Sequence, residues 1–208
     1  MVRCCVCLVT EEELEKSGRK NMPDKLKVLD VGGGHESRAS LFYPGAEITT
    51  LDKETGWIWP ENDLPGGKWD IIFCNHFIEH IINPDEFLNE CKRVMQSNTI
   101  LEVGMPNLIA WFNRIAFLFG YLPHSYEVSY FYNVGKWLNW NEETLGKHVR
   151  VMSYKATMEL LNKHGFRIIW SRGEASTYPC AWPIRIFDKA MTRLSPNLAS
   201  AFRIKCVL

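Results

Sequence analysis

The histidines are the residues of this sequence best suited to transfer protons. An imidazole titrates near neutral pH and can act as a general base toward a hydroxyl group. The candidates are His76, His80, His124 and His148. We rank His148 first, because it opens the motif His148-Val149-Arg150 after an aromatic-rich segment, and His80 second, because it follows Glu79. Since a histidine taken singly is more often structural than catalytic, the ranking depends on the elements that place these residues.

A glycine-rich turn offers a second kind of chemistry, which is ligand binding at the backbone. Gly32, Gly33 and Gly34 follow the apolar run that ends at Asp30-Val31. Glycine has no Cβ and tolerates positive φ, so a ligand can approach such a turn closely, and the next helix points its N-terminus there. The dinucleotide fingerprint G-x-G-x-x-G needs a third glycine where Ser37 stands. The turn therefore disfavours a nicotinamide cofactor without excluding it.

The spacing between this turn and a later acidic residue is typical of a nucleoside-binding site. Asp52 ends a strand-like run about twenty residues after Gly32. A carboxylate at that position can accept both ribose hydroxyls of a nucleoside. A lone Asp at a strand end is usually a turn former, but its spacing from the glycine turn favours ribose binding here.

The elements that position these residues alternate between strands and helices. Short apolar runs predict strands at 27–31, 46–51, 69–74, 99–103, 166–170 and 202–208. Apolar residues at helical spacing predict helices at 84–95, 153–164 and 184–194. The first 25 residues are expected to form a short helical lead-in, with 11–20 as its charged face. The link from Asp52 to Trp69 is too rich in Gly and Pro for more than a very short helix. The alternation predicts an α/β protein with a mostly parallel sheet in one domain over residues 1–208.

Aromatic side chains crowd residues 111–140, and we treat 107–147 as a lid or substrate insertion. Three interpretations stay open: additional core, an apolar acceptor pocket that excludes water, or peripheral membrane contact. The last is suggested by residues 108–122, where Arg114 is the one charged residue, and by residues 185–205, where five basic residues stand against Asp188. Basic and apolar residues interleaved in this way can bind an anionic bilayer surface.

The overall composition narrows the partners and the compartment. Lys+Arg and Asp+Glu both total 24, so no charge excess points to a nucleic-acid partner. The seven cysteines complete no zinc-binding pattern, and we expect no metal site. They are best read as reduced thiols, and no run reaches the roughly 18 apolar residues of a membrane span. We expect a soluble, cytoplasmic protein.

The ordered set of motifs resembles the class I S-adenosylmethionine (SAM)-dependent methyltransferases, and within them the small-molecule branch called type 11. The matching motifs are Leu29-Asp30-Val31-Gly32-Gly33-Gly34, Asp52, Leu64-Pro65, Asp70, Glu79-His80, Arg93-Val94, Met105-Pro106-Asn107, His148-Val149-Arg150 and Gly165-Phe166. They cover roughly residues 26–172. No single motif is diagnostic, and their order carries the resemblance.

The resemblance implies a fold, a cofactor and a reaction. The fold is a doubly wound, Rossmann-like, mostly parallel sheet of seven strands, whose antiparallel last strand, 202–208, lies beside 166–170. The cofactor is SAM, and the acceptor is a small molecule or a lipid- or glycan-linked intermediate. The implied cofactor-binding residues are Asp30, Gly32, Gly33, Gly34, Asp52, Lys53, Asn62, Asp63, Asn75 and His76, with Asn62 and Asp63 at the adenine.

One departure from the family pattern keeps a second function open. Glu36 stands where the family's loop has its third glycine, near the methionine end of SAM. We expect the side chain to turn away from that end. If it does not, the chain is a SAM-fold protein without catalysis that serves as a binding or scaffold partner. A nicotinamide-dependent oxidoreductase is a third, weaker alternative, and the oligomeric state stays open.

Overall fold

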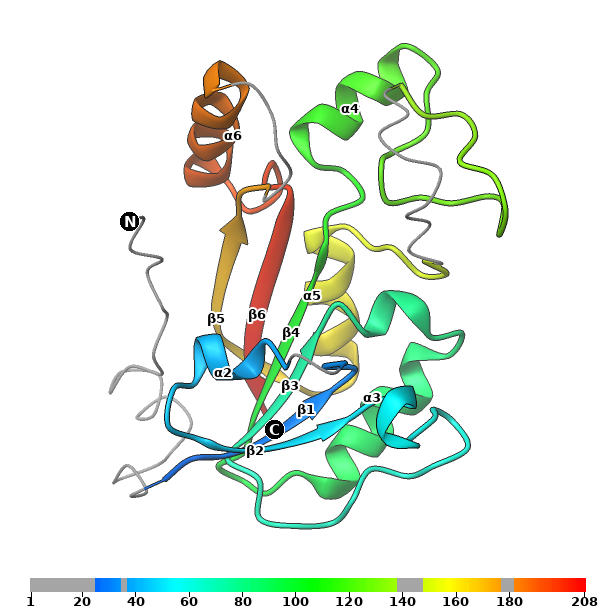
Figure 1. Ribbon diagram of the computed structural model, residues 1–208. Helices are drawn as coiled ribbons and strands as arrows, with labels where there is room; N and C mark the ends of the chain where they lie inside the picture. The colour runs from blue at the N-terminus through cyan, green and yellow to red at the C-terminus, as the bar shows by residue number, and fades with distance from the viewer. Residues whose placement is uncertain (1–24, 35–36, 138–147, 177–181) are drawn as a thin grey trace.

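The computed structural model describes residues 25–34, 37–137, 148–176 and 182–208 (Figure 1). These residues contain one six-stranded sheet in the order β2-β1-β3-β4-β6-β5. Its strands are β1 (Lys27–Val31), β2 (Glu47–Leu51), β3 (Ile71–Asn75), β4 (Ile100–Pro106), β5 (Arg167–Glu174) and β6 (Ala201–Val207). The first four are parallel to one another, whereas β6 is antiparallel to both β4 and β5. The structure is therefore of the α/β class, as the sequence predicts.

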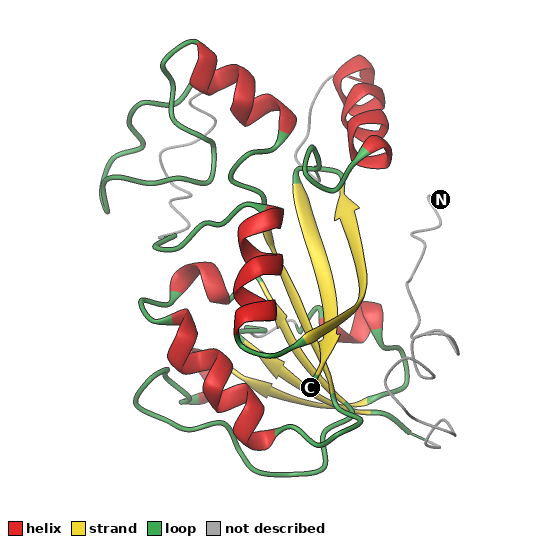
Figure 2. Cartoon of the chain, turned by 180° about the vertical axis from the view of Figure 1, so that it is seen from behind, coloured by secondary structure: helices red, strands yellow, loops and turns green. Residues whose placement is uncertain are grey.

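Helices pack on both faces of this sheet (Figure 2). They are α2 (Ala39–Phe42), α3 (Pro84–Val94), α4 (Trp111–Leu118), α5 (Tyr154–Lys163) and α6 (Trp182–Leu194), with the 3-10 helices η1 (Lys53–Thr55) and η2 (Ile78–His80). Alternate strand residues point to opposite faces. Leu29 of β1 therefore joins a core with Leu88 of α3 and Leu161 of α5, while its neighbour Val28 joins a second core with Ala39 of α2. The doubly wound arrangement is confirmed.

The strand order places a ligand-binding position at one point of the sheet. β1 pairs with β2 on one side and with β3 on the other. In open α/β sheets, ligands bind outside the carboxyl ends of strands where the order reverses in this way. The residues that follow β1 and β3 therefore lie at the expected ligand-binding position.

The predicted last strand is confirmed, but the predicted strand count is wrong. β6 lies antiparallel beside β5, with Phe202 opposite Gly173 and Val207 opposite Arg167. The sheet of the described residues has six strands and not seven. Residues 107–137, between β4 and the α5 region, contribute α4 and loops instead of a strand, and their one bridge, Leu122 to Lys136, lies outside the sheet.

A buried ion network ties β4 to β6 and β5. Arg203 of β6 donates to Glu102 of β4 at 2.8 Å and to Glu174 of β5 at 2.5 Å. Tyr43, which follows α2, donates its hydroxyl to the other oxygen of Glu102. Burial opposes the charge on Arg203, but the two carboxylates outweigh it and raise the pKa of the guanidinium. The network satisfies charges that would otherwise be costly to bury.

The aromatic segment is largely exposed where the structure describes it. Phe117, Phe119, Tyr130, Phe131 and Tyr132 are each more than 45% exposed. These five side chains are therefore not part of a core, contrary to the interpretation of the aromatic segment as additional core. The described part of the chain contains no helix with the length and apolar character needed to cross a bilayer.

Several sequence-based expectations lie outside the described residues. They are the helical lead-in, of which residues 1–24 are not described, the orientation of Glu36, the cysteines Cys4, Cys5 and Cys7, and the end of the proposed insertion at 138–147.

Candidate active site

The glycine turn after β1 is shaped by contacts that exclude side chains. Gly32 has φ of 79°, and a Cβ there would lie 2.6 Å from Cδ2 of Phe77. A Cβ on Gly33 would lie 2.2 Å from Oδ2 of Asp30, while Gly34 again has positive φ, 62°. The backbone N–H of Gly32 donates to the carbonyl of Leu51 at 2.7 Å, which joins the turn to the end of β2. The turn therefore needs its glycines and exposes their backbone to a ligand.

Two carboxylates stand beside this turn. Asp30 is buried at the end of β1, and the Ser37 hydroxyl donates to its Oδ2. Burial raises the pKa of Asp30; the Ser37 bond opposes this shift, and the charge of Asp52 adds to it. Asp52 follows β2 and caps η1, where its Oδ1 accepts from the N–H of Glu54 at 3.0 Å. The turn and both carboxylates therefore share one edge of the sheet.

The other residues expected near the cofactor after β2 are Lys53, Asn62 and Asp63, and they lie in η1 and in the loop that follows it. Lys53 opens η1 and is exposed. Asn62 accepts the backbone N–H of Ile58 at 2.9 Å through its side-chain oxygen, and the carbonyl of Asp63 accepts from the Trp57 indole at 3.1 Å. Both therefore shape the loop after η1, and their assignment to adenine stays a prediction.

The end of β3 brings two further candidates to the same edge. Asn75 lies opposite Gly104 of β4, where a Cβ would lie 2.2 Å from the Asn75 side-chain oxygen. His76 follows with φ of 58°, an unusual conformation for a residue other than glycine, and its N–H donates to the Gly104 carbonyl at 2.8 Å. Strained backbone of this kind concentrates at functional sites. The strain turns the chain from β3 into η2.

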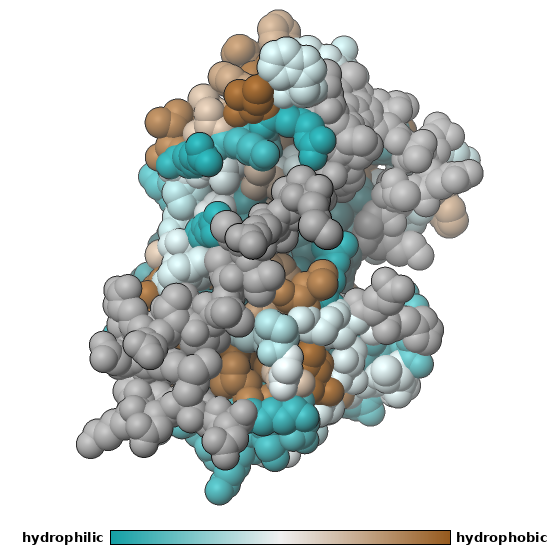
Figure 3. Space-filling model, turned by 60° about the vertical axis from the view of Figure 1, so that its left-hand side comes forward, coloured by the Kyte–Doolittle hydropathy of each residue, from teal (hydrophilic) through white to brown (hydrophobic). Residues whose placement is uncertain are grey.

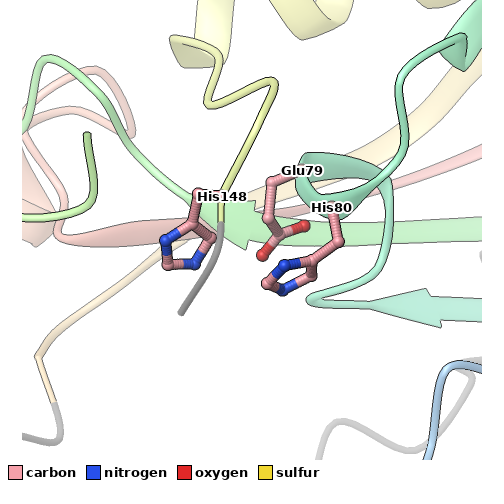
Figure 4. A group of neighbouring side chains, drawn as sticks. All are labelled: Glu79, His80 and His148. Atoms are coloured by element: carbon pink, nitrogen blue, oxygen red, sulfur yellow. The ribbon is translucent and has the colours of Figure 1, made fainter. Parts of the chain in front are cut away.

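The two catalytic candidates, His80 of η2 and His148 far along the chain, lie next to each other (Figure 4). His80 and His148 stack with ring centroids 4.8 Å apart and an angle of 23° between the planes. Glu79 lies beside them and is fully buried. Its carbonyl accepts the N–H groups of Val149 at 2.7 Å and Arg150 at 2.9 Å, which fixes the two segments together.

A second carboxylate orients His148. Glu127 accepts the backbone N–H of His148 at 3.2 Å, and its Oε1 lies 3.3 Å from the ring Nδ1. Burial lowers the pKa of His148 and the neighbouring His80 lowers it further, while Glu79 and Glu127 act in the opposite direction. The net shift favours the neutral imidazole, which has one nitrogen lone pair to offer.

Sequence reasoning missed Glu127 and Phe77. Glu127 lies inside the aromatic segment, and no spacing relates it to His148. Phe77 follows His76 directly and packs on the glycine turn, so it joins the cofactor edge to the histidine group two residues later. His124, the fourth histidine, is also half-buried, and burial, then Lys136 and His148, lower its pKa.

Fold and site together define an α/β protein with a glycine turn and two carboxylates at the switch point, beside a histidine–carboxylate group. A family model described as a methyltransferase domain matches residues 9–170, which is most of the chain. The chain therefore belongs to this family and is a class I SAM-dependent methyltransferase. No curated protein matches it.

Solved structures support the fold. One is a SAM-dependent methyltransferase from Archaeoglobus fulgidus, with a TM-score of 0.52, 16% identity, and coverage of 89% of this chain and 87% of that one. Another is a putative methyltransferase from Bacillus halodurans, with a TM-score of 0.54, 15% identity, and coverage of 94% and 98%. A third is a putative methyltransferase of Haloferax volcanii in complex with the Trm112 methyltransferase activator, with a TM-score of 0.54, 12% identity, and coverage of 93% and 87%.

The residues at the switch point fit SAM. Gly32 and Gly33 have no room for side chains against Phe77 and Asp30, and Gly34 has positive φ, so the turn can offer its backbone to the cofactor. Asp52 stands at the end of the neighbouring strand, where the ribose of a nucleoside is recognised. The cofactor is SAM and not a nicotinamide.

Proposed function

We propose that this enzyme methylates a hydroxyl group of a small-molecule or lipid- or glycan-linked acceptor. The observation that carries the proposal is the position of His80 and His148. The Glu79-His80 pair begins two residues after Phe77, which packs on the glycine turn, so the histidines adjoin the cofactor edge. A hydroxyl must lose its proton to become a good nucleophile, and imidazoles are the side chains best suited to assist at neutral pH.

The cofactor-side residues bind and orient, and SAM supplies the activated methyl group on its sulfonium. We assign the ribose to Asp52 and the methionine end to the turn Gly32–Gly34. Asp30 supports this turn through its bond with Ser37. Asn75 and His76 hold the end of β3 against β4, beside the cofactor. On the acceptor side, His148 and His80 activate the hydroxyl, and Glu127 holds His148 in place.

Replacing Asp52 with alanine is expected to weaken SAM binding at least tenfold, because each charge-assisted hydrogen bond to ribose contributes about 1.5–3 kcal/mol. Isothermal titration of SAM into the purified chain measures this. Asp52→Asn is the matched variant, because it keeps an oxygen that can cap η1 but loses the charge. A dissociation constant that stays unchanged in both variants would remove Asp52 from the ribose site.

We propose that α6 makes the peripheral membrane contact through which a lipid-linked acceptor is reached. Arg185, Lys189 and Arg193 are four residues apart and form one stripe along the helix. Trp182 and Ile186, which are 73% and 58% exposed, lie along the same side. The acid of this helix, Asp188, is buried and accepts from the Trp111 indole at 2.7 Å, so it does not oppose the basic stripe.

The surface over α6 has the character expected of such a helix. Figure 3 shows hydrophobic and hydrophilic side chains next to one another at the top of the molecule. Trp111 of α4 also packs edge-to-face on Phe187 of α6, with centroids 4.9 Å apart. The contact joins α6 to the segment that follows β4, at the same end of the sheet (Figure 1).

Vesicle flotation is expected to show binding to anionic bilayers. Each basic residue near such a surface contributes about 1 kcal/mol, so the triple variant Arg185→Gln, Lys189→Gln, Arg193→Gln should lose most of the bound fraction. The matched control is Lys92→Gln, Lys155→Gln and Lys163→Gln, which removes the same charge from α3 and α5. Equal binding of both triple variants, or equal binding to neutral vesicles, would contradict a role for α6.

A further inference from the structure

Three side chains at the acceptor side converge in the manner of a metal site. Glu79, His80 and His148 each offer one ligand atom, and these atoms all lie within 4.8 Å of one another. Two of the residues belong to η2, while the third lies far along the chain (Figure 4). The backbone bonds from Val149 and Arg150 to the Glu79 carbonyl hold the two segments in register. The convergence is thus built into the fold.

An unsatisfied buried atom points to a ligand at this place. Oε1 of Glu79 lies 3.0 Å from Nδ1 of His76, but Oε2 is buried and has no hydrogen-bond partner. A buried carboxylate oxygen without a partner is destabilising, because no hydrogen bond offsets its lost hydration. A cation bound at Oε2 would remove that cost.

The surroundings of His148 match those of a metal-bound imidazole. Metal-binding histidines almost always donate their second ring N–H to a carboxylate or a carbonyl, which fixes the tautomer and the ring orientation. Glu127 stands 3.3 Å from Nδ1 of His148 in that role, which leaves Nε2 with its lone pair. The His80 ring stacks on His148 at 23°, so ligation requires one ring to rotate about χ2.

We propose that Glu79, His80 and His148 bind one divalent transition-metal ion, with Glu127 as a positioning residue. Two imidazole nitrogens and one carboxylate oxygen form a ligand set that suits Zn²⁺ and leaves a coordination position open. The inference rests on the proposed function and refines it: the two histidines would activate the hydroxyl through the bound ion instead of accepting its proton directly. The open position would take the acceptor's hydroxyl oxygen. Coordination lowers the pKa of an oxygen ligand, so its proton leaves to solvent. The oxygen then bonds to the methyl carbon as the carbon–sulfur bond breaks and sulfur keeps the electron pair.

Direct metal titration tests the site without any acceptor. The full chain is prepared with Cys4, Cys5 and Cys7 replaced by serine, so that thiols do not compete, and is stripped with EDTA. Zn²⁺ is then titrated in competition with a chromophoric chelator. We expect one equivalent to bind with a dissociation constant of about 1 μM or lower. His148→Ala and His80→Ala should each weaken binding at least 100-fold, and Glu127→Gln by about 10- to 100-fold.

The control is His164→Ala, which removes a histidine of similar exposure that pairs with Asp85 at 2.8 Å. Its zinc affinity should equal that of the parent chain. Circular dichroism identifies any variant that does not fold. If one of His148→Ala, His80→Ala and Glu127→Gln fails to fold, the remaining two test the site. Absence of stoichiometric binding to the parent chain, or zinc affinity equal to that of the parent chain in folded His80→Ala and His148→Ala, overturns the metal site. SAM titration on the same samples tests the cofactor site separately, since the residues assigned to SAM do not include the three proposed metal ligands.

Discussion

Replacing His148 with alanine is expected to lower the rate of methyl transfer by about 100- to 10,000-fold, the range measured when a side chain that assists proton removal is lost. The imidazole is held by Glu127 on one side and stacks on His80 on the other. Alanine removes the imidazole that we assign to the acceptor and leaves Glu127 and Glu79 without their neighbour. SAM binding should change little, because the glycine turn and Asp52 are untouched.

The measurement is the rate of S-adenosylhomocysteine formation with an acceptor found in a panel of phenols, sugars and polyprenyl-linked sugars. His164→Ala is the matched control, because the two side chains are 12% and 17% exposed and each pairs with a carboxylate. It should retain full activity. A His148→Ala enzyme with normal kcat would show that this residue does not activate the acceptor.

Replacing Gly32 with alanine is expected to abolish SAM binding in practice. The residue has φ of 79°, and a left-handed conformation costs a residue with a Cβ about 1–2 kcal/mol. The new Cβ would also lie 2.6 Å from the Phe77 ring, and overpacking of this kind costs about 1–3 kcal/mol more. Relief of either strain displaces the turn to which we assign the cofactor. We expect the dissociation constant for SAM to rise at least 30-fold.

Gly45→Ala separates the effect of backbone strain from the effect of the clash with Phe77. Gly45 has φ of 83°, but a Cβ there would meet nothing within 4 Å. This variant carries the same backbone strain away from the cofactor edge, so it should lose some stability and keep its SAM affinity. Isothermal titration and thermal unfolding of both variants measure the two effects. Equal SAM affinity in Gly32→Ala and the parent chain would place the cofactor elsewhere.

Local patterns predicted most of the fold. The apolar run ending at Asp30-Val31 forms β1, and the periodic residues of 84–95 form α3, because Phe87, Leu88 and Cys91 face the core. The prediction of a seventh strand came from the family resemblance, because the sequence itself contains only six strand-like runs. Residues 107–137 have no alternating pattern, so they form α4 and loops.

The candidate site was predictable only in part. Gly32 and Asp52 belong to short motifs whose spacing follows from one βαβ unit. The meeting of Glu79 with His148 depends on backbone bonds between segments far apart in the sequence, and the place of Glu127 depends on the path of an irregular loop. Neither has a local signature. The same reason explains why the cysteine spacing predicted no metal site, while the fold brings two histidines and a carboxylate together.

Isothermal titration of the purified chain with SAM, S-adenosylhomocysteine and NADH tests the central claim most directly. SAM should bind at one site in the micromolar range, which corresponds to about −7 to −8 kcal/mol. S-adenosylhomocysteine should compete with it, and NADH should not bind. Binding of NADH in preference to SAM, or no binding of SAM by the folded chain, would contradict the assignment of the switch point to this cofactor.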